Sequence, residues 1–421
     1  MPVIGDFIKI KHGYAFKGDY ISTEDNNIVL VTPGNFAIGG GFKEQKCKFY
    51  IGKYPDDYVL KEDDLIVTMT DLSKSVDTLG YGALVPSSNK RVYLHNQRIG
   101  LVQFISDKID KHYLYWYMRT SRYQRSIVAT SSGSTVHHTS PDRICEVEIE
   151  VPEMKIQKKI AGFLDDIEEK INVNENINRN LSEQAQAVFT SWFLKFEPFN
   201  ESMKRSPTGK EVPKSFEYVQ INDLEHILET GKRPKGGAVS EGIPSLGAES
   251  VKGIGRFNLS NIKYIPIEFA QKQIKGKVNG YELMIYKDGG KPGEFHPNFS
   301  MFGEGYPFDD FFINEHVFKL DFGNRGYNEF AYFYFQTDYV KHWLESNGGK
   351  AAIPGINQNV VNSIWILSPN SPKVKEYCNW VQPLFTQILK NCCLNMRLSE
   401  LRDSLLPKLM SGEIDLSELD N

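Results

Sequence analysis

A long segment without proline, EMKIQKKIAGFLDDIEEKINVNENINRNLSEQAQAVFTSWFLKF, occupies residues 153–196 and contains a single glycine, Gly162. Helix-forming residues dominate this segment, and its apolar residues recur in a heptad on two rows, namely Ile160, Ile167, Leu181 and Val188 on one and Leu164, Ile171, Ala185 and Trp192 on the other. Such a narrow apolar seam predicts a long helix that packs against a second long helix. A helix of about 42 residues is about 63 Å long.

The second half of the chain repeats this pattern. An offset of 217 carries the two rows onto Tyr377, Leu384, Leu398 and Leu405, and onto Val381, Ile388, Arg402 and Leu409. Other segments match near the same offset, including residues 3–7 (VIGDF) with 220–224 (QINDL), 95–98 (HNQR) with 313–316 (INEH), and 113–120 (YLYWYMRT) with 330–337 (FAYFYFQT). Their common order indicates a tandem duplication of a unit about half the chain long.

Two polar residues interrupt the heptad in both copies, because Asn174 and Asn178 correspond to Asn391 and Asn395. A polar residue at a core heptad position fixes the register of paired helices at a cost in stability. If the helices pack antiparallel, we expect the four asparagines to form one polar layer; the alternative is two independent surface helices of common ancestry. Arg402 on an apolar row predicts a frayed or partner-contacting helix end. The predicted seam comprises Ile160, Leu164, Ile167, Ile171, Asn174, Asn178, Leu181, Val188, Val381, Leu384, Ile388, Asn391, Asn395, Leu398, Leu405 and Leu409.

Each long helical segment follows about 150 residues of mixed character, rich in glycine, aromatic residues and turn signals. Residues 64–69 (DLIVTM) and 145–151 (CEVEIEV) are predicted strands, and residues 113–128 and 329–344 are predicted helices. The predicted fold is therefore α+β, with two similar globular domains separated by two long helices packed as an antiparallel coiled coil. The predicted boundaries are 1–152 and 218–370 for the two globular domains, 153–197 and 371–413 for the helices, 198–217 for an exposed linker with three prolines, and 414–421 for an acidic tail.

Composition excludes several classes of protein. Hydrophobic residues make up 40% and charged residues 24% of the 421 residues, which is ordinary for a globular protein and excludes global disorder. The N-terminal residues MPVIGDFIKIKHG do not predict a signal peptide, and no apolar run is long enough to span a membrane. The cysteines, Cys47, Cys145, Cys378, Cys392 and Cys393, show no zinc-binding spacing, so we expect a cytoplasmic protein with free thiols and no bound metal.

Two globular domains on a rigid pair of helices suggest a device that measures distance, and DNA is the natural target of such a device. The net charge of −4 means that any DNA binding must come from local patches. Residues 230–299 contain 11 Lys and Arg against 6 Asp and Glu, and the basic residues stand beside Gly and Pro, as loops that approach phosphates do. The polar loops 131–140 (SSGSTVHHTS) and 346–358 (SNGGKAAIPGINQ) occupy equivalent places in the repeat, and their side-chain types can contact base edges. Solvated surface turns have the same composition.

The predicted DNA-contacting residues come from these loops in both halves. They are Lys11, Tyr14, Lys17, Thr70, Lys74, Arg98, Ser132, Ser134, Thr135, His137, His138, Lys232, Arg233, Lys235, Lys287, Lys291, His296, Lys350, Asn357 and Gln358.

Over nearly its full length, the chain resembles the specificity subunit of type I restriction–modification systems. Residues 401–414 (LRDSLLPKLMSGEI) and 191–199 (SWFLKFEPF) carry most of the resemblance, and the turns at 231–234 and 287–290 add to it. In the first half, Gly13 is followed by Tyr-Ala-Phe, and residues 70–73 (TDLS) replace the glycine turn, so the contacts of that domain depart from the family pattern. The resemblance implies two target-recognition domains that each read one half of a bipartite, asymmetric site in double-stranded DNA.

The resemblance also implies the partners. The helices would set the spacer between the half-sites and dock two adenine-methyltransferase subunits, which bind S-adenosylmethionine. Two restriction subunits would supply ATP-dependent translocation and Mg²⁺-dependent cleavage. This chain would then hold no cofactor, and it contains neither an amino-methylation motif nor a GxxxxGK[ST] loop.

Two other classes of function compete with this interpretation. Pro141-Asp142 followed by Glu153-Met154-Lys155 satisfies a loose PD…ExK nuclease pattern, in which the carboxylates hold Mg²⁺. However, the ExK element belongs on a strand, and here it begins a predicted helix. A single-chain nuclease would cut DNA with Mg²⁺ alone and lose this activity in Asp142→Ala. A coiled-coil scaffold would show no sequence-dependent DNA signal with any partner.

Overall fold

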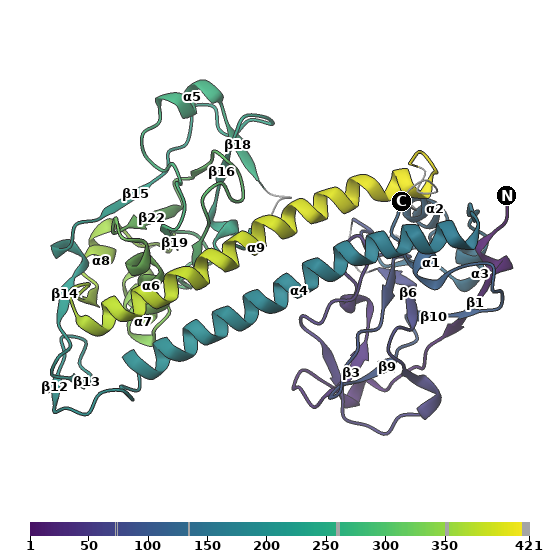
Figure 1. The fold of residues 1–421 in the computed structure, drawn as a ribbon, viewed down its shortest axis with the longest axis horizontal. Coiled ribbons are helices and arrows are strands. Elements are labelled where there is room, and N and C mark those ends of the chain that lie inside the picture. The colour runs from purple at the N-terminus through teal and green to yellow at the C-terminus, as the bar shows by residue number, and fades with distance from the viewer. Residues whose placement is uncertain (72, 74, 134, 258–261, 350–352, 415–421) are drawn as a thin grey trace. The chain divides into compact units, whose positions relative to one another are not determined.

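The computed structural model describes residues 1–414 apart from residues 72, 74, 134, 258–261 and 350–352. The chain forms two compact units: unit 1 comprises residues 1–170 and 398–421, and unit 2 comprises residues 171–397. The predicted globular segments, 1–152 and 218–370, fall in different units. Each unit combines β-sheets, short helices and part of both long helices (Figure 1), so the predicted α+β class is confirmed.

Unit 1 contains two main sheets. The first is antiparallel throughout and has the order β1 (Ile8–His12), β10 (Ile99–Phe104), β6 (Leu65–Thr68), β8 (Gly82–Leu84). The second includes a parallel pair, β3 with β9, and has the order β2 (Ile21–Ser22), β4 (Lys48–Tyr50), β3 (Ile28–Val31), β9 (Val92–His95), β5 (Val59–Leu60). The strand predicted at residues 64–69 is β6.

Unit 2 repeats the core of this topology, as the sequence duplication predicts, but its first sheet has five strands instead of four and its second sheet three instead of five. Its first sheet has the order β15 (Ile227–Thr230), β22 (Val317–Asp321), β19 (Leu283–Tyr286), β20 (Phe299–Met301), β17 (Gly253–Ile254). Its second sheet again contains a parallel pair, β16 with β21, in the order β18 (Lys263–Ile265), β16 (Ile243–Leu246), β21 (Phe312–Ile313).

Each predicted short helix is in fact two helices with a break at a threonine. Residues 113–128 form α1 (Lys111–Tyr117) and α2 (Ser121–Ala129), and the hydroxyl of Thr120 donates to the carbonyl of Tyr117 at 2.8 Å. Residues 329–344 form α6 (Arg325–Phe335) and α7 (Asp338–Gly348), and the hydroxyl of Thr337 donates to the carbonyl of Tyr334 at 2.7 Å. Threonine favours such local bonds at helix ends, so the same residue stops the first helix in both copies.

The prediction of a strand over residues 145–151 was wrong. Pro141–Cys145 is a short helix, α3, which begins after the capping residue Ser140, and Glu148 then makes an isolated bridge with Val3. In unit 2 the corresponding pair is a regular ladder between β14 (Tyr218–Gln220) and β23 (Trp365–Leu367). Pro2 occupies the position of Val219 in β14 and has no N–H to donate, which explains why the ladder is not extended in unit 1.

Residues 198–217 are not an exposed linker. They contain a hairpin of β12 (Met203–Arg205) and β13 (Glu211–Pro213), and the side chains of Val212 and Phe216 are buried in the core of unit 2. The three prolines and mixed charges indicated an irregular segment, but two apolar residues suffice to dock it on the core.

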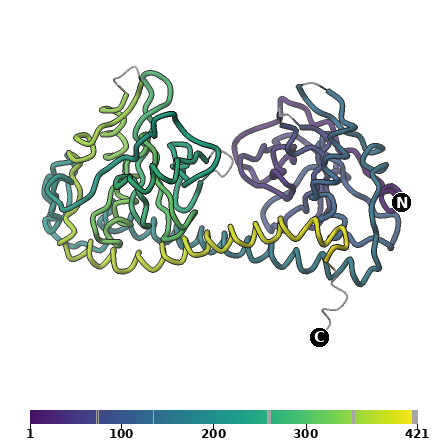
Figure 2. The backbone as a smooth tube through the Cα atoms, turned by 90° about the horizontal axis from the view of Figure 1, so that it is seen from above, coloured from purple at the N-terminus to yellow at the C-terminus, as the bar shows by residue number. Residues whose placement is uncertain are grey.

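The two long helices, α4 (Met154–Phe193) and α9 (Pro372–Met410), pack together in antiparallel directions, as predicted. In unit 2, where their segments run side by side (Figure 2), Asn174 Nδ2 donates to Asn395 Oδ1 at 2.7 Å, and Asn391 Nδ2 donates to Asn178 Oδ1 at 2.8 Å. The four asparagines therefore form one polar layer between the helices. No described helix is long and apolar enough to cross a membrane.

The apolar surface of the long helices is wider than the predicted seam. All sixteen seam residues are buried or half-buried, but Phe189, Phe193, Phe385 and Leu389 are buried as well. Phe189, Phe193 and Phe385 pack against α6, which lies between the helices and the sheet of unit 2; the rings of Phe189 and Phe330, for example, are 5.6 Å apart. Each long helix thus has two partners, the other helix and a globular domain.

Arg402 is neither frayed nor unpaired. In unit 1 its NH1 lies 2.5 Å from Glu168 Oε2, and the second oxygen of Glu168 lies 3.5 Å from Arg119 NH1. The charge on the apolar row therefore joins α9 to α4, and Glu168 in turn joins α4 to the end of α1.

Candidate nucleic-acid interface

Most of the described predicted contact residues of unit 1 lie in one group of loops. We call residues 13–17, 69–71, 96–98, 131–133 and 135–139 loop cluster 1. Backbone hydrogen bonds tie its members together: Met69 N–H donates to the carbonyl of Arg98 at 3.0 Å, and Thr139 N–H donates to the carbonyl of Met69 at 3.0 Å. Segments that are far apart in the sequence thus meet at the C-terminal end of β6.

The polar side chains of loop cluster 1 are ordered by a small ladder between β7 (Thr70–Asp71) and β11 (His137–His138). Thr70 Oγ1 lies 3.1 Å from His138 Nδ1, and the backbones of Ser132 and His138 exchange two hydrogen bonds of 3.0 and 2.8 Å. Thr70, which is buried, is therefore a neighbour of Ser132 and His138 of the predicted polar loop.

Asp71 anchors this ladder. Its carboxylate accepts hydrogen bonds from the backbone of Ser73 at 2.7 Å, and from the backbone and hydroxyl of Thr78 at 2.6 and 2.7 Å. Burial raises the pKa of Asp71, but these hydrogen bonds outweigh burial and hold the pKa below its usual value. The carboxylate is thus ionised and fully occupied in holding the loop.

Gly13 allows the first segment to reach the cluster. A Cβ at this position would lie 2.1 Å from the carbonyl oxygen of Asn96, so any side chain would clash with backbone. Tyr14 follows, and its N–H donates to the carbonyl of His95 at 2.8 Å. The exposed ring of Tyr14 packs against Phe16 and Tyr58, with centroids 5.1 and 5.3 Å apart.

Unit 2 builds the same frame at equivalent positions. We call residues 231–235, 287–289, 314–316, 348–349 and 353–357 loop cluster 2. Lys287 N–H donates to the carbonyl of His316 at 3.1 Å, and Ile356 N–H donates to the carbonyl of Lys287 at 2.8 Å. Gly231 again permits a close approach, because a Cβ there would lie 1.6 Å from the carbonyl oxygen of Ile313.

The side chains on this second frame are different. Lys287 Nζ donates to Asp288 at 2.7 Å, and His316 Nδ1 contacts the same carboxylate. Burial raises the pKa of Asp288, but the hydrogen bonds from Lys287 and His316 lower it below its usual value. A shallow depression beside this group is lined by Thr230, Lys287, Phe318, Asn357, Gln358 and Asn359.

Asn357 and Gln358 also have structural roles. Asn357 Oδ1 caps α8 (Gln358–Asn362) by accepting from Val360 N–H at 3.1 Å, and Gln358 Nε2 donates to the carbonyl of Leu228 at 2.8 Å. Ser140 caps α3 in the same way in unit 1, at 3.3 Å from Arg143 N.

The remaining predicted contacts lie at the margins of the clusters or outside them. Lys17, Arg98, Thr135, Lys232, Arg233 and Lys235 belong to the clusters and are exposed, whereas Lys291 and His296 lie on an exposed loop between β19 and β20. Lys11 is engaged within unit 1, because its Nζ donates to the carbonyl of Asp57 at 2.8 Å and lies 4.7 Å from the ring centre of Tyr58. Lys74, Ser134 and Lys350 lie outside the described residues.

The residues at the tips of the turns 96–98 and 314–316 were not among the predicted contact residues. Asn96 Oδ1 accepts from Arg98 N–H at 3.1 Å, and Asn314 Oδ1 accepts from His316 N–H at 2.9 Å, so both asparagines shape the same turn. The turns present exposed Gln97 and half-buried Glu315 at equivalent positions. The repeat match between residues 95–98 and 313–316 was the signal that could have found them.

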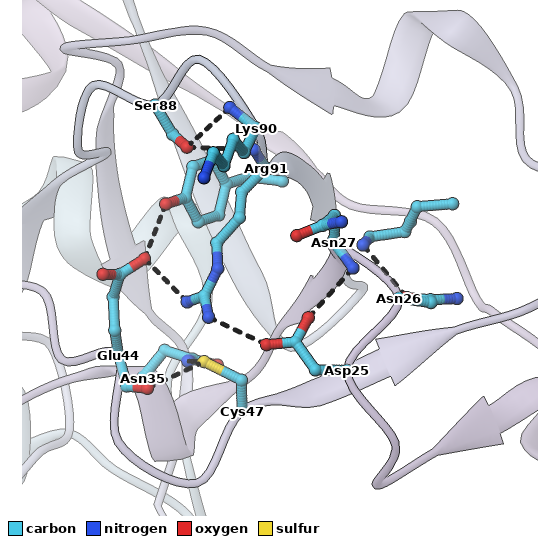
Figure 3. Close-up of polar contacts among 11 residues, drawn as sticks. Asp25, Asn26, Asn27, Asn35, Glu44, Cys47, Ser88, Lys90 and Arg91 are labelled. Carbon is cyan, nitrogen blue, oxygen red and sulfur yellow. Dashed lines mark hydrogen bonds and ion pairs between the residues drawn. The ribbon is translucent and has the colours of Figure 1, made fainter. Parts of the chain in front are cut away.

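Arg91 shows that the number of basic residues does not measure the positive charge that is available to DNA. Its guanidinium lies between Glu44 and Asp25, 3.0 Å from a carboxylate oxygen of each, and the hydroxyl of Tyr93 donates to the same Glu44 oxygen at 2.7 Å (Figure 3). Arg91 precedes β9, and the turn at 96–98 follows the other end of that strand. Its charge is therefore compensated within unit 1.

The structure gives no support to a nuclease centre. Among the described residues, no group of three or more His, Cys, Asp or Glu side chains is placed to hold a metal ion, and all five cysteines are free. Asp142 lies in α3, Glu153 precedes α4, and Lys155 lies in the first turn of α4 rather than on a strand.

The chain is thus a tandem pair of α+β units with two long antiparallel helices and with loop clusters at equivalent positions. Residues 3–183 match the family model for the type I restriction modification DNA specificity domain. The first half of the chain thus matches a type I DNA specificity domain, and most of the chain is similar in sequence to type I restriction enzyme specificity subunits.

Individual relatives agree with this assignment. The chain is 27% identical over 319 residues to the MjaIX specificity subunit of Methanocaldococcus jannaschii, covering 74% of this chain and 71% of that relative. It is 23% identical over 356 residues to the HindI specificity subunit of Haemophilus influenzae, covering 70% of this chain and 75% of that relative. A crystal structure of the type I S subunit from M. genitalium has the same fold, with a TM-score of 0.59 at 16% identity, covering 99% of this chain and 96% of that chain.

Proposed function

We propose that this chain is the non-catalytic DNA-recognition subunit of a type I restriction–modification complex, and that each loop cluster reads one half of a bipartite, asymmetric site in double-stranded DNA. The observation that carries the proposal is the repeated backbone frame, which holds two different sets of side chains. A shared frame with different side chains is what reading two different half-sites requires.

The chemistry of the clusters fits this role. Hydroxyl, amide and imidazole groups such as those of the exposed Ser132, His138 and Gln97 can donate to or accept from base edges in the major groove. Exposed cations such as Lys232 and Arg233 suit phosphate oxygens, which position the protein on the duplex without reading sequence. The backbone frames continue directly from β6 and β19, so the base-contacting and the phosphate-contacting side chains are held by ordered strands.

We further propose that the long helices set the unspecified spacer and dock two adenine-methyltransferase subunits. The asparagine layer supports a fixed spacer, because sliding one helix past the other would separate hydrogen-bonded partners that are otherwise buried. Large apolar side chains exposed on the helices support the docking of protein partners; they are Phe163, Val173, Ile177, Trp380, Leu394 and Leu401.

On this proposal the chemistry belongs to partner subunits. The methyltransferases would bind S-adenosylmethionine, and two restriction subunits would use ATP and Mg²⁺. This chain would contribute recognition and geometry and would itself hold no cofactor.

The test is a map of methylated adenines in cells that express this chain with the methyltransferase of the same locus, compared with cells that lack only this chain. We expect a split, asymmetric motif with a fixed gap that is methylated only when the chain is present. Identical maps from soluble, co-purifying proteins would contradict the proposal and favour a scaffold. Mg²⁺-dependent cutting by the purified chain, abolished in Asp142→Ala, would favour a nuclease.

A further inference from the structure

The shared frame of the two loop clusters allows their side chains to be compared position by position. With an offset of 218, residues 14–17 (YAFK) correspond to residues 232–235 (KRPK). Phe16 and Pro234 are both buried, whereas the other three residues of each segment are exposed. The two segments therefore present the same three positions to solvent.

At these positions, loop cluster 2 carries more positive charge than loop cluster 1. Lys232 and Arg233 replace Tyr14 and Ala15, and Lys235 matches Lys17. Just after the equivalent strands β6 and β19, Lys287 replaces the buried Met69. Beyond the clusters on the same side, the exposed Lys291 replaces Ser73. In the opposite direction, Arg98 of loop cluster 1 is replaced by His316, and Thr70 is replaced by Asp288.

The extra cations are available to a ligand. Lys232, Arg233, Lys235 and Lys291 are exposed, and none of them forms an ion pair with a residue that the structure describes. Loop cluster 2 also has two acidic residues: Asp288 is already held by Lys287 and His316, and the half-buried Glu315, which replaces Gln97, lies 3.6 Å from His316 Nε2. The matching surface of unit 1 presents the neutral ring of Tyr14, while the ammonium of nearby Lys11 is bonded to the carbonyl of Asp57.

We infer that unit 2 supplies most of the phosphate contacts, and hence most of the salt-dependent affinity for DNA, whereas unit 1 binds its half-site mainly through neutral groups. This inference rests on the proposed function and adds an unequal division of work between the two domains. Lys232 and Arg233 are the principal phosphate-binding residues on this view, and Tyr14 marks the corresponding uncharged position.

The expected effect follows from counterion release. Each phosphate contact contributes about 0.9 to the slope of log K against log salt concentration, so losing two contacts reduces the slope by about 2. Between 50 and 200 mM salt, the wild-type complex should then lose about tenfold more affinity than the double variant Lys232→Ala/Arg233→Ala.

The experiment measures the Kd of the complex of this chain with its methyltransferase subunits for a duplex that contains the methylated site, at several salt concentrations. The cluster 1 comparison is Lys17→Ala/Arg98→Ala, which also removes two exposed cations. The matched control is Lys204→Ala/Arg205→Ala, which removes the same residue types from exposed positions of β12 in unit 2. Equal melting temperatures of the variants show that folding is unchanged.

We expect the largest fall in slope for Lys232→Ala/Arg233→Ala, a smaller fall for the cluster 1 variant, and none for the control. A slope unchanged in Lys232→Ala/Arg233→Ala, or lowered as much by the cluster 1 variant, would overturn the inference while leaving sequence-specific binding intact. Failure of the wild-type complex to prefer the methylated site over unrelated DNA would instead overturn the proposed function.

Discussion

Asn391 donates a 2.8 Å hydrogen bond from Nδ2 to Oδ1 of Asn178, and so joins α9 to α4 in unit 2. Asn391 is 5% exposed, and its own Oδ1 accepts from Gln387 at 2.8 Å. Together with the bond between Asn174 and Asn395, this contact satisfies polar groups that would otherwise be buried without partners. This hydrogen bond forms in one register of the two helices, and a shift of one helix along the other would break it.

The contributions of the asparagines to the free energy of unfolding should therefore be coupled. We expect Asn391→Leu to lower the free energy of unfolding by about 1–3 kcal/mol, because Asn178 loses its partner in a half-buried site. The double variant Asn178→Leu/Asn391→Leu should cost less than the sum of the single variants, because it leaves neither amide unpaired. Urea unfolding of the four proteins checks this, with the exposed Asn172→Leu as control. Strict additivity would contradict the coupling.

The two glycines that begin the loop clusters should be irreplaceable. Gly13→Ala and Gly231→Ala would place a Cβ 2.1 and 1.6 Å from backbone carbonyl oxygens, so we expect each to lower the free energy of unfolding by about 1–3 kcal/mol or more. Gly162→Ala is the matched control, because its Cβ would meet nothing within 4 Å and should stabilise the helix by about 0.5–1 kcal/mol. Equal melting temperatures for all three would show that the close approaches are not formed.

Glu329 should make the stability of unit 2 depend on pH. This carboxyl is fully buried in α6, and burial raises its pKa to about 8, although Arg325 NH2 lies 3.0 Å away and opposes the shift. An unfolded chain has the ordinary value of 4.5, so between these two values the folded protein holds a proton that the unfolded chain releases. The contribution of Glu329 to the free energy of unfolding is therefore fully present at low pH and is lost as the pH rises towards 8.

Glu329→Gln removes this titration while keeping the shape of the side chain. We expect the free energy of unfolding of the variant to change less between pH 6 and pH 8.5 than that of the wild type, and the two curves to diverge most at the alkaline end. Urea unfolding across this range is the measurement. Parallel curves would mean that Glu329 does not change its protonation on unfolding.

The sequence predicted the architecture well where two copies of a signal could be compared. The heptad rows, the paired asparagines and the segments near an offset of 217 together predicted an antiparallel helix pair and two similar domains, and both are observed. The helix breaks at Thr120 and Thr337 could not be predicted from apolar content, because a side-chain hydrogen bond ends each helix. The width of the apolar helix surface was also not predicted, since Phe189 and Phe385 contact α6, which the heptad pattern does not reveal.

The candidate site was predicted in parts but not as an assembly. The loops at 69–71, 96–98 and 131–139 were identified separately, and their joining depends on backbone bonds such as that between Met69 and Arg98, which carry no sequence signature. Gln97 and Glu315 were missed for a different reason, because the repeat match between residues 95–98 and 313–316 was not used to compare the side chains of the two turns. Lys11 stays a prediction, and its hydrogen bond to the carbonyl oxygen of Asp57, in a distant turn, had no sequence signal either.

The central claim is that each loop cluster reads its own half of a split site. The most direct measurement is the methylated motif written by the complex in three forms: wild type, a cluster 1 variant with Ser132→Ala and His138→Ala at two exposed positions, and a cluster 2 variant with Asn357→Ser, which keeps a capping hydroxyl. We predict that the cluster 1 variant relaxes or changes bases in one half of the motif, that the cluster 2 variant affects the other half, and that the gap is constant in all three. Changes that fall in both halves at once, or a motif unchanged by variants of both clusters, would contradict the account.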